Sequence, residues 1–264
     1  MNVLFVGDVV GKAGRRVLRA ALKSVQAEVA ADFTVVNVEN AAGGFGLTGS
    51  VWDELRSLPV DVFTSGNHIW DKKETLPLLD SEPRLLRPAN YPAGNPGRGY
   101  CVVPSRGGVP VGVVNLQGLT FMTAIESPFV VADRVLDEVR RSAAAVVVDF
   151  HAEATSEKQA LAWYLDGRVS LVVGTHTHVP TADERILPRG TAALTDAGMT
   201  GPYEGVIGFK PEAVLERFLY ATPRALEPAV RGAALCGVVV EVDETTGLAL
   251  SVRRIRREEA QAAS

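Results

Sequence analysis

Short apolar runs alternate with longer segments of helical periodicity in the first part of the chain. Residues 2–7, 33–38 and 60–64 are apolar and rich in β-branched side chains, which predicts buried strands. Apolar residues recur at every third or fourth position over residues 13–31, which predicts an amphipathic helix. Residues 50–53 are typical of the start of another helix. Strands separated by helices in this way predict βαβ units, and therefore a parallel sheet covered by helices.

The alternation continues through the middle of the chain and then changes. We predict a strand pair at residues 100–103 and 109–116. Predicted helices at residues 130–142 and 157–165 then alternate with predicted strands at residues 144–150 and 169–173. Alternating apolar and polar residues predict antiparallel strands at residues 185–187, 192–195, 234–242 and 248–253. Residues 84–99 predict a long surface loop, and residues 256–264 a solvated tail. Because no repeat or linker divides the sequence, we expect an α/β protein with a single domain over residues 1–264.

Composition narrows the class of protein. With 47% hydrophobic and 22% charged residues, the 264-residue chain can bury a large core. No apolar run reaches the ~18–20 residues of a membrane span, and the sequence starts without the features of a secretory signal. We therefore expect a cytoplasmic protein with no membrane partner. The net charge of −4 argues against an extensive nucleic-acid surface, although bound metal ions could attract an anionic substrate. Cys101 and Cys236 are expected to be reduced core residues.

Polar residues follow the predicted buried strands. Asp8, Glu39, Asn67, His151 and His176 each come directly after a strand or within a few residues of one. In an open parallel sheet the carboxyl ends of the strands face one crevice, which is where ligands bind. These separated segments are therefore expected to bring carboxylate, amide and imidazole groups together.

The histidines strengthen this hypothesis. The chain has only 4 of them, and all fall at strand ends: His68, His151, His176 and His178. A mixture of carboxylate, amide and imidazole ligands suits manganese, iron or zinc, and no thiolate is present to form a closed structural zinc site. The sequence therefore predicts a metal site.

Each residue taken alone also allows a structural role. Asp8 could cap the following helix, and residues 39–40 could form a turn. Residues 67–68 could form a left-handed turn, and His151 could be a hydrogen-bonded core residue. We favour the metal interpretation because these separate roles would not place every histidine at a strand end.

The order of these residues resembles the calcineurin-like metallophosphoesterase superfamily. The matching blocks are Gly7-Asp8, Glu39-Asn40, Gly66-Asn67-His68, His151 and Gly174-Thr175-His176-Thr177-His178. The sequence is most similar to the bacterial cyclic-nucleotide phosphodiesterase branch, which also carries a Glu-Asn block and a Gly-Met-Thr-Gly stretch like residues 198–201. The resemblance implies a layered α/β fold with central mixed sheets flanked by helices.

The sequence departs from the superfamily pattern at two positions. Most members have a histidine where this chain has Val10, and an aspartate where it has Glu39. The resemblance implies that Asn40 replaces the missing ligand. It implies a first metal held by Asp8, Glu39, Asn40 and His178, and a second held by Glu39, Asn67, His151 and His176, with Glu39 bridging the two. The cofactors would be two divalent or trivalent ions, with iron or manganese favoured and zinc as the alternative.

The implied activity is hydrolysis of small cyclic nucleotides of the 2′,3′-cyclic AMP type by a hydroxide held between the two metals. His68 would protonate the leaving oxygen, or alternatively only orient the phosphate. The loops at residues 41–49 and 196–201 are expected to border the crevice, and the substrate-binding residues are not predicted.

Two other functions remain open at this point. A phosphomonoesterase such as a nucleotidase would need cations near the metals, for which Arg98 and Arg106 are candidates. A non-catalytic, metal-dependent regulatory protein would need an incomplete catalytic set. The partner is expected to be a small phosphate ester, and a homo-oligomer is compatible with sheet edges in the strands after Arg185.

Overall fold

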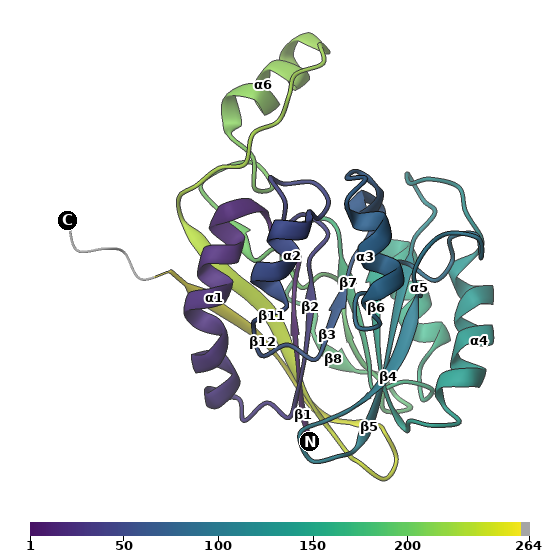
Figure 1. Cartoon of the computed structure of the whole chain (residues 1–264). Coiled ribbons are helices and arrows are strands. Elements are labelled where there is room, and N and C mark those ends of the chain that lie inside the picture. The colour runs from purple at the N-terminus through teal and green to yellow at the C-terminus, as the bar shows by residue number, and fades with distance from the viewer. Residues whose placement is uncertain (260–264) are drawn as a thin grey trace.

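The computed structural model describes residues 1–259, in which two β-sheets pack face to face between layers of helices (Figure 1). The helices are α1 (Gly11–Glu28), α2 (Gly49–Leu55), the 3-10 helix η1 (Asn67–Trp70), α3 (Thr75–Ser81), α4 (Pro128–Val139), α5 (Thr155–Tyr164) and α6 (Pro211–Tyr220). The strands are β1 (Asn2–Val6), β2 (Phe33–Asn37), β3 (Val62–Thr64), β4 (Tyr100–Pro104), β5 (Pro110–Gln117), β6 (Ala145–His151), β7 (Leu171–Thr175), β8 (Arg185–Ile186), β9 (Ala192–Leu194), β10 (Gly201–Pro202), β11 (Ala233–Val242) and β12 (Ala249–Glu258).

Both sheets are mixed. The first has the order β10-β11-β1-β2-β3, with β12 paired to β11, and its β1, β2 and β3 are parallel. The second has the order β4-β5-β6-β7-β9-β8, in which β5, β6, β7 and β9 are parallel. The parallel pairing predicted for the first three strands is confirmed in β1, β2 and β3, although both sheets also contain antiparallel strands. The antiparallel strands predicted after residue 185 are found as well, except that β9 also runs parallel to β7. The layered fold with mixed sheets, implied by the family resemblance, is confirmed.

Each central strand is buried on both faces. In β1, Val3 and Phe5 point into the core between the sheets, whereas Leu4 and Val6 point toward the helices. Successive side chains of a strand lie on opposite faces, so a strand with a layer on each side is apolar throughout. This explains why the predicted strands read as continuous apolar runs instead of alternating ones.

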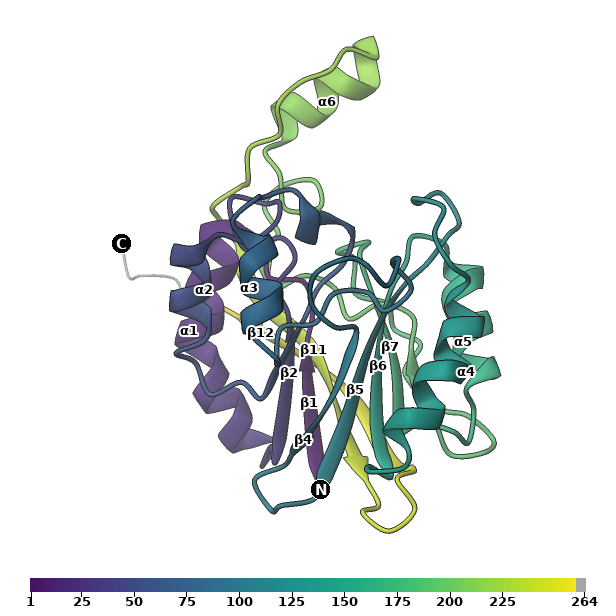
Figure 2. The same ribbon diagram turned by 45° about the vertical axis from the view of Figure 1, so that its right-hand side comes forward.

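Helices cover the outer face of each sheet (Figure 2). The apolar side of α1, together with α2 and α3, packs on the first sheet, and α4 and α5 pack on the second. Thr48, rather than a residue of the 50–53 stretch, caps α2, since its side chain accepts a hydrogen bond from the Val51 amide. The short helices η1 and α3 were not predicted from the sequence.

Two further sequence predictions need correction. Residues 84–99 form a loop, but its first part is buried: Leu85 and Leu86 are completely inaccessible to solvent and bridge to Phe63 and Arg98. The predicted tail at residues 256–264 begins as strand, because β12 continues to Glu258 alongside β11. Residues 260–264 lie outside the described part of the chain.

Helix α6 was also not predicted, and it projects from the body of the molecule (Figures 1 and 2). It lies in the excursion between β10 and β11, and Pro211 starts it without losing a helical hydrogen bond. Several large side chains on or beside this helix are exposed, among them Leu215, Phe218, Leu219 and Tyr220. The base of the excursion returns to the end of the sandwich where the parallel strands terminate.

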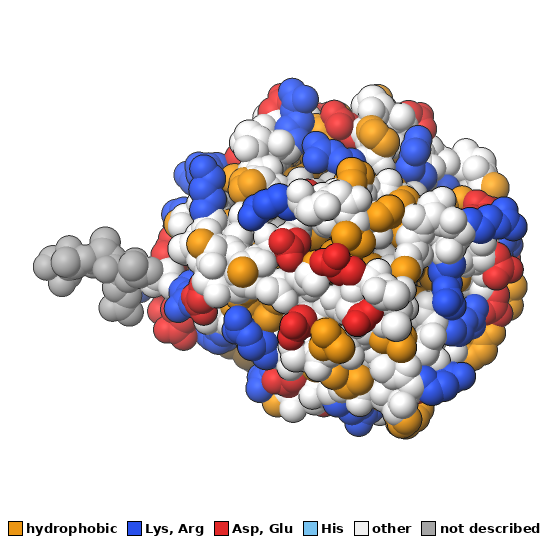
Figure 3. Space-filling view, turned by 90° about the horizontal axis from the view of Figure 1, so that it is seen from below, with side chains coloured by type: hydrophobic (Ala, Val, Ile, Leu, Met, Phe, Trp, Pro, Cys, Tyr) orange, Lys and Arg blue, Asp and Glu red, His pale blue; other side chains and the backbone are white. Residues whose placement is uncertain are grey.

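The surface charges, the helices and the two cysteines can also be compared with what the sequence predicts. Basic and acidic side chains are interspersed on the face opposite α6 (Figure 3). None of the helices in the described residues has the length and apolar character needed to cross a membrane. Cys101 and Cys236 are both free thiols, as expected, and burial raises the pKa of Cys101 to about 12.

Candidate metal centre

The predicted site residues meet at one end of the sandwich, although they come from different sheets. Asp8, Glu39 and Asn67 follow the parallel strands β1, β2 and β3 of the first sheet. His151 ends β6, and His176 follows β7, in the second sheet. The carboxyl ends of these strands face the same space because the two sheets pack with these ends together.

Potential metal-binding atoms fall into two groups. Glu39, His151 and His176 offer atoms that all lie within 4.8 Å of one another, and so do Asp8, Glu39 and His178. Glu39 belongs to both groups. The two groups thus divide these residues in the way that the superfamily resemblance implies.

The second group of predicted ligands converges on the Nε2 atom of His151. Glu39 Oε1 lies 3.0 Å from it, His176 Nδ1 3.0 Å and Asn67 Oδ1 3.1 Å. The oxygens of Glu39 and Asn67 carry no hydrogen and can only accept, and the same holds for an imidazole nitrogen that carries no hydrogen. Such a concentration of lone pairs is stabilised by a cation.

Buried atoms without partners give a second indication of a cation. Asp8 Oδ1 and Asn40 Oδ1 are buried and have no hydrogen-bond partner among the described residues, and buried Glu39 Oε1 faces the Nε2 atom of His151. The other polar atom of each side chain is held: Asp8 Oδ2 accepts from the His176 amide, Glu39 Oε2 from the His68 amide, and Asn40 Nδ2 donates to the Gly44 carbonyl. An unsatisfied buried polar atom costs roughly 1–3 kcal/mol. The residues present therefore fit bound metal ions.

The three histidines of the cluster also fit metal binding, because the ring nitrogen that faces away from the centre has an acceptor. His178 Nδ1 lies 2.8 Å from the carbonyl oxygen of Ile207, so that nitrogen is the donor. His176 Nε2 lies 3.2 Å from a carboxylate oxygen of Glu153. His151 Nδ1 lies 2.9 Å from the hydroxyl of Thr175. Hydrogen bonds of this kind fix the tautomer of metal-binding histidines.

The electrostatics of the cluster favour positive charge. Burial raises the pKa of Asp8 well above its ordinary value. Burial alone would lower the pKa of His151, but the carboxylates of Glu39 and Asp8 outweigh it and raise that pKa to about 9. Burial also opposes ionisation of Glu39, but His151 chiefly holds its pKa near 2. Burial and the charge of His151 lower the pKa of His176 to about 3. Without metal, a proton on His151 takes the place of the cation.

Local backbone geometry explains two features of the sequence blocks. His176 and His178 have φ angles of 97° and 67°, in the left-handed region that non-glycine residues rarely adopt. Strain of this kind concentrates at functional sites, where the surrounding structure enforces it. A Cβ atom at Gly66 would lie 2.3 Å from Glu39 Oε2 and 2.2 Å from His151 Cδ2. Position 66, directly before Asn67, therefore requires glycine, because a Cβ atom there would collide with Glu39 and His151.

His68 lies beside the cluster without belonging to either metal-binding group. Its amide contacts Glu39, and its Nδ1 lies 2.8 Å from Asp71 Oδ2. Phe45 of the glycine-rich loop packs edge-on against the His68 ring at 4.9 Å between centroids, and stacks on Phe209 at 5.1 Å. The prediction that the loop at residues 41–49 borders the site is therefore correct. The role of Asp71 was missed, although its position three residues after His68 was a usable signal.

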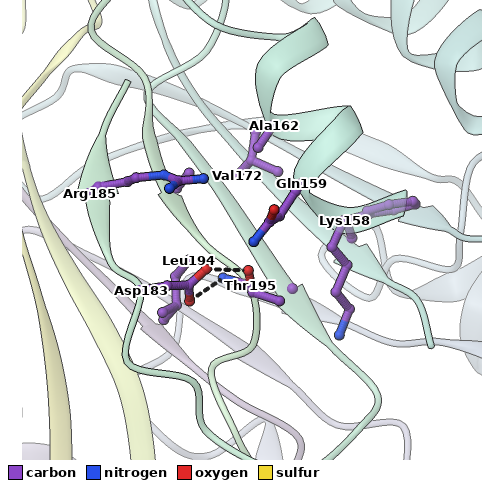
Figure 4. Close-up of a pocket in the computed structure, with 11 residues that line it drawn as sticks. Lys158, Gln159, Ala162, Val172, Asp183, Arg185, Leu194 and Thr195 are labelled. Atoms are coloured by element: carbon purple, nitrogen blue, oxygen red, sulfur yellow. Dashed lines mark hydrogen bonds between the residues drawn. The ribbon is translucent and has the colours of Figure 1, made fainter. Parts of the chain in front are cut away.

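A buried ion pair supports the loop that carries His176 and His178. The side chain of Lys158 extends from α5 (Figure 4), and its Nζ lies 2.6 Å from Asp196 Oδ2. The same oxygen accepts hydrogen bonds from the amide and hydroxyl of Thr177. The small cavity drawn in Figure 4 is lined by Lys158 and Thr195 among others, but by none of the predicted site residues. No pattern in the sequence indicated this pair.

The two arginines considered as phosphate ligands lie elsewhere. The amide of Arg106 bonds to the carbonyl of Asp32, at the start of β2, whereas Glu39 follows the end of that strand. Arg98 lines a surface groove with Tyr100, beside edge strand β4. Neither arginine contacts a predicted site residue among the hydrogen bonds and ion pairs of the described part of the chain.

The layered fold and this cluster of carboxylate, amide and imidazole groups define a metallophosphoesterase of the calcineurin-like class. The sequence matches the YmdB-like protein family over residues 4–255, and the chain belongs to this family. The family implies divalent metal ions, as the cluster does.

Three relatives extend over almost the whole chain. A 2′,3′-cyclic-nucleotide 2′-phosphodiesterase of Bacillus subtilis (strain 168) is 46% identical, covering 97% of this chain and 96% of its own. A crystal structure from Thermus thermophilus, described as that of a hypothetical protein, is 42% identical with a TM-score of 0.92, over 98% of this chain and 100% of the other. The structure of a novel phosphatase from Mycoplasma pneumoniae is 36% identical with a TM-score of 0.91, over 98% and 93%.

Proposed function

We propose that this metallophosphoesterase hydrolyses small cyclic nucleotides of the 2′,3′-cyclic AMP type. The observation that carries the proposal is the pair of metal-binding groups that share the buried carboxylate of Glu39. The similarity to the Bacillus subtilis phosphodiesterase supports the substrate class. The two groups support a dinuclear centre, since a shared carboxylate can bridge two ions.

We assign the first ion to Asp8, Glu39, Asn40 and His178, and the second to Glu39, Asn67, His151 and His176. The unpaired, buried oxygens of Asp8 and Asn40, and the position of Glu39 in both metal-binding groups, support this division. When bound, two divalent ions lower the pKa of water at the site and neutralise charge on the phosphoryl oxygens. The nitrogen and oxygen donors, with no thiolate among them, favour iron or manganese, with zinc as the alternative.

His68 is the proposed general acid. It lies next to Asn67 in the chain but outside both metal-binding groups, so its ring is free to act on the substrate. Its side chain is 27% exposed, and Asp71 holds Nδ1. The Nε2 atom is then the position from which a proton reaches the leaving oxygen. A general acid in this position typically contributes about 10²–10⁴-fold to the rate.

The positions of the arginines favour a diester over a monoester substrate. A cyclic diester carries one negative charge, whereas a monoester carries up to two near neutral pH and is commonly gripped by additional cations. Arg98 and Arg106, the candidates for such a grip, lie away from the cluster.

A single domain, a cytoplasmic location and a homo-oligomer remain predictions.

The test is hydrolysis of 2′,3′-cyclic AMP, 3′,5′-cyclic AMP and nucleotide monophosphates after reconstitution with manganese or iron. The wild type is compared with Asn67→Ala, which removes one proposed ligand. Metal-dependent turnover of the 2′,3′-cyclic diester that disappears in the variant would support both the substrate and the site. Turnover of monophosphates alone would contradict the substrate class. Metal binding without cleavage of any ester would favour the regulatory alternative.

A further inference from the structure

A fully buried carboxylate lies directly beneath the metal-binding cluster. Asp149, on β6, is completely inaccessible to solvent and points into the space between the sheets. Its Oδ2 accepts hydrogen bonds from Asn37 Nδ2 at 2.9 Å and Thr64 Oγ1 at 2.5 Å. Its Oδ1 accepts one from Thr175 Oγ1 at 2.7 Å. A buried carboxylate is expensive unless donors satisfy it, and here three donors from other strands do so.

Each of these partners belongs to a strand that delivers a residue to the cluster. Asn37 is on β2 and also accepts from the Glu39 amide at 3.1 Å. Thr64 ends β3, just before Asn67, and Thr175 ends β7, just before His176. Asp149 itself lies two residues before His151 on β6. One side chain thus connects strands of both sheets at the level of the site.

The direction of the hydrogen bonds determines the tautomer of His151. Thr175 has a single hydroxyl proton, and it gives that proton to Asp149. Its oxygen can therefore only accept from His151 Nδ1, which lies 2.9 Å away. Nδ1 then carries hydrogen, and Nε2 presents its lone pair to the side where Glu39, Asn67 and His176 converge. The chain Asp149–Thr175–His151 therefore selects the nitrogen that faces the cluster.

We infer that Asp149 is a positioning residue of the metal centre, acting through Thr175 to fix the orientation and tautomer of His151. The inference rests on the proposed metal centre and goes beyond it, because it assigns a role to two residues that contact neither substrate nor metal. A purely structural Asp149 would hold the two sheets together but would have no selective effect on one metal site.

The variants interrupt the chain Asp149–Thr175–His151 at different links. Thr175→Val removes the hydroxyl at nearly constant volume, and Thr175→Ser keeps the hydroxyl but loses the methyl group. Asp149→Asn places an amide nitrogen opposite one of the donors that the carboxylate accepts from. Thr34→Val is the matched control: Thr34 is also buried, on β2, but its hydroxyl contacts Gln26.

The measurement is Mn²⁺ binding to metal-free protein, followed by the electron paramagnetic resonance signal of free Mn²⁺. Thr175→Val and Asp149→Asn should each weaken one of two Mn²⁺ sites by about 10–100-fold, the range for loss of an outer-shell partner. Their double mutant should lose little more, because both act in one chain. Thr175→Ser and Thr34→Val should bind as the wild type does.

Several outcomes would overturn the inference. Wild-type affinity at both sites in folded Thr175→Val would reduce Asp149 to a structural role, as would an equal loss at both sites. Nuclear magnetic resonance of the Zn²⁺-loaded wild type provides a test that needs no variant: His151 must bind through Nε2 with hydrogen on Nδ1. A wild type that binds Mn²⁺ but cleaves no cyclic nucleotide contradicts only the proposed substrate, whereas one that binds no Mn²⁺ contradicts the metal centre itself.

Discussion

His68 and Asp71 form a side-chain pair at the edge of the metal-binding cluster, with Nδ1 and Oδ2 2.8 Å apart. Both lie on or directly after the 3-10 helix η1, in which side chains three residues apart lie above one another. Asp71 therefore fixes the ring of His68 with Nε2 directed away from it. The pair has the geometry expected of a proton donor and the residue that orients it.

This arrangement predicts a specific effect of His68→Ala. Cleavage of 2′,3′-cyclic AMP should fall about 10²–10⁴-fold in kcat, because the leaving alkoxide is poor and needs a proton. Cleavage of bis-p-nitrophenyl phosphate should fall much less, since its leaving group is stable without one. Mn²⁺ affinity serves as the control and should be unchanged. An equal loss for both substrates would favour the alternative in which His68 only orients the phosphate.

The left-handed backbone of His176 predicts a difference between two variants that both lack the imidazole. At its φ of 97°, glycine has no Cβ penalty, whereas alanine keeps one. Metal-free His176→Gly should therefore be more stable than His176→Ala by about 1 kcal/mol. Urea unfolding of the two proteins measures the difference. Equal or reversed stability would mean that the conformation at this residue is not strained.

Metal binding should strengthen as pH rises. The pKa of His151 in the metal-free protein is raised to about 9, chiefly because the Glu39 carboxylate outweighs burial, so below that pH a metal must displace a proton. The apparent Mn²⁺ affinity should therefore increase about tenfold per pH unit between about pH 6.5 and 8.5. Glu39, with a pKa near 2, is ionised throughout and does not contribute.

Calorimetric titrations in buffers of different ionisation enthalpy would count the protons released. His151→Gln is the control: whatever binding it retains should have lost the part of this pH dependence that is due to the proton on His151. Wild-type affinity that stays constant across the range would contradict the assignment of the proton to His151.

The buried ion pair beneath the histidine loop predicts a large loss of stability. Lys158 and Asp196 are 3% and 1% exposed, and removing one partner leaves the other charge buried. Lys158→Met should lower the free energy of unfolding by about 3–5 kcal/mol. The same change at Lys210, whose pair with Glu227 is on the surface, should have a small effect. Similar losses for both variants in urea unfolding would show that burial of the pair does not matter.

The sequence alone determined which residues gather at the cluster. The apolar runs locate β1, β2, β3, β6 and β7. The type of a polar residue at the end of such a run indicates its chemistry without knowledge of the tertiary structure. Asp8, Glu39, Asn67, His151 and His176 were identified in this way. The order of these blocks along the chain was also sufficient to indicate the superfamily.

Only the tertiary structure decided how these residues face one another. The strands belong to two sheets, so Glu39 meets His151 across the sandwich, and no local pattern encodes that pairing. The role of Asp149 depends on donors from three other strands, and the tautomer of His178 on a carbonyl 29 residues away. The positions of Arg98 and Arg106 were not predictable for the same reason: a charge has no periodicity that indicates which end of a strand it will occupy. Local chemistry is set by residue type, whereas contacts between segments far apart in the chain are set by the packing of the layers.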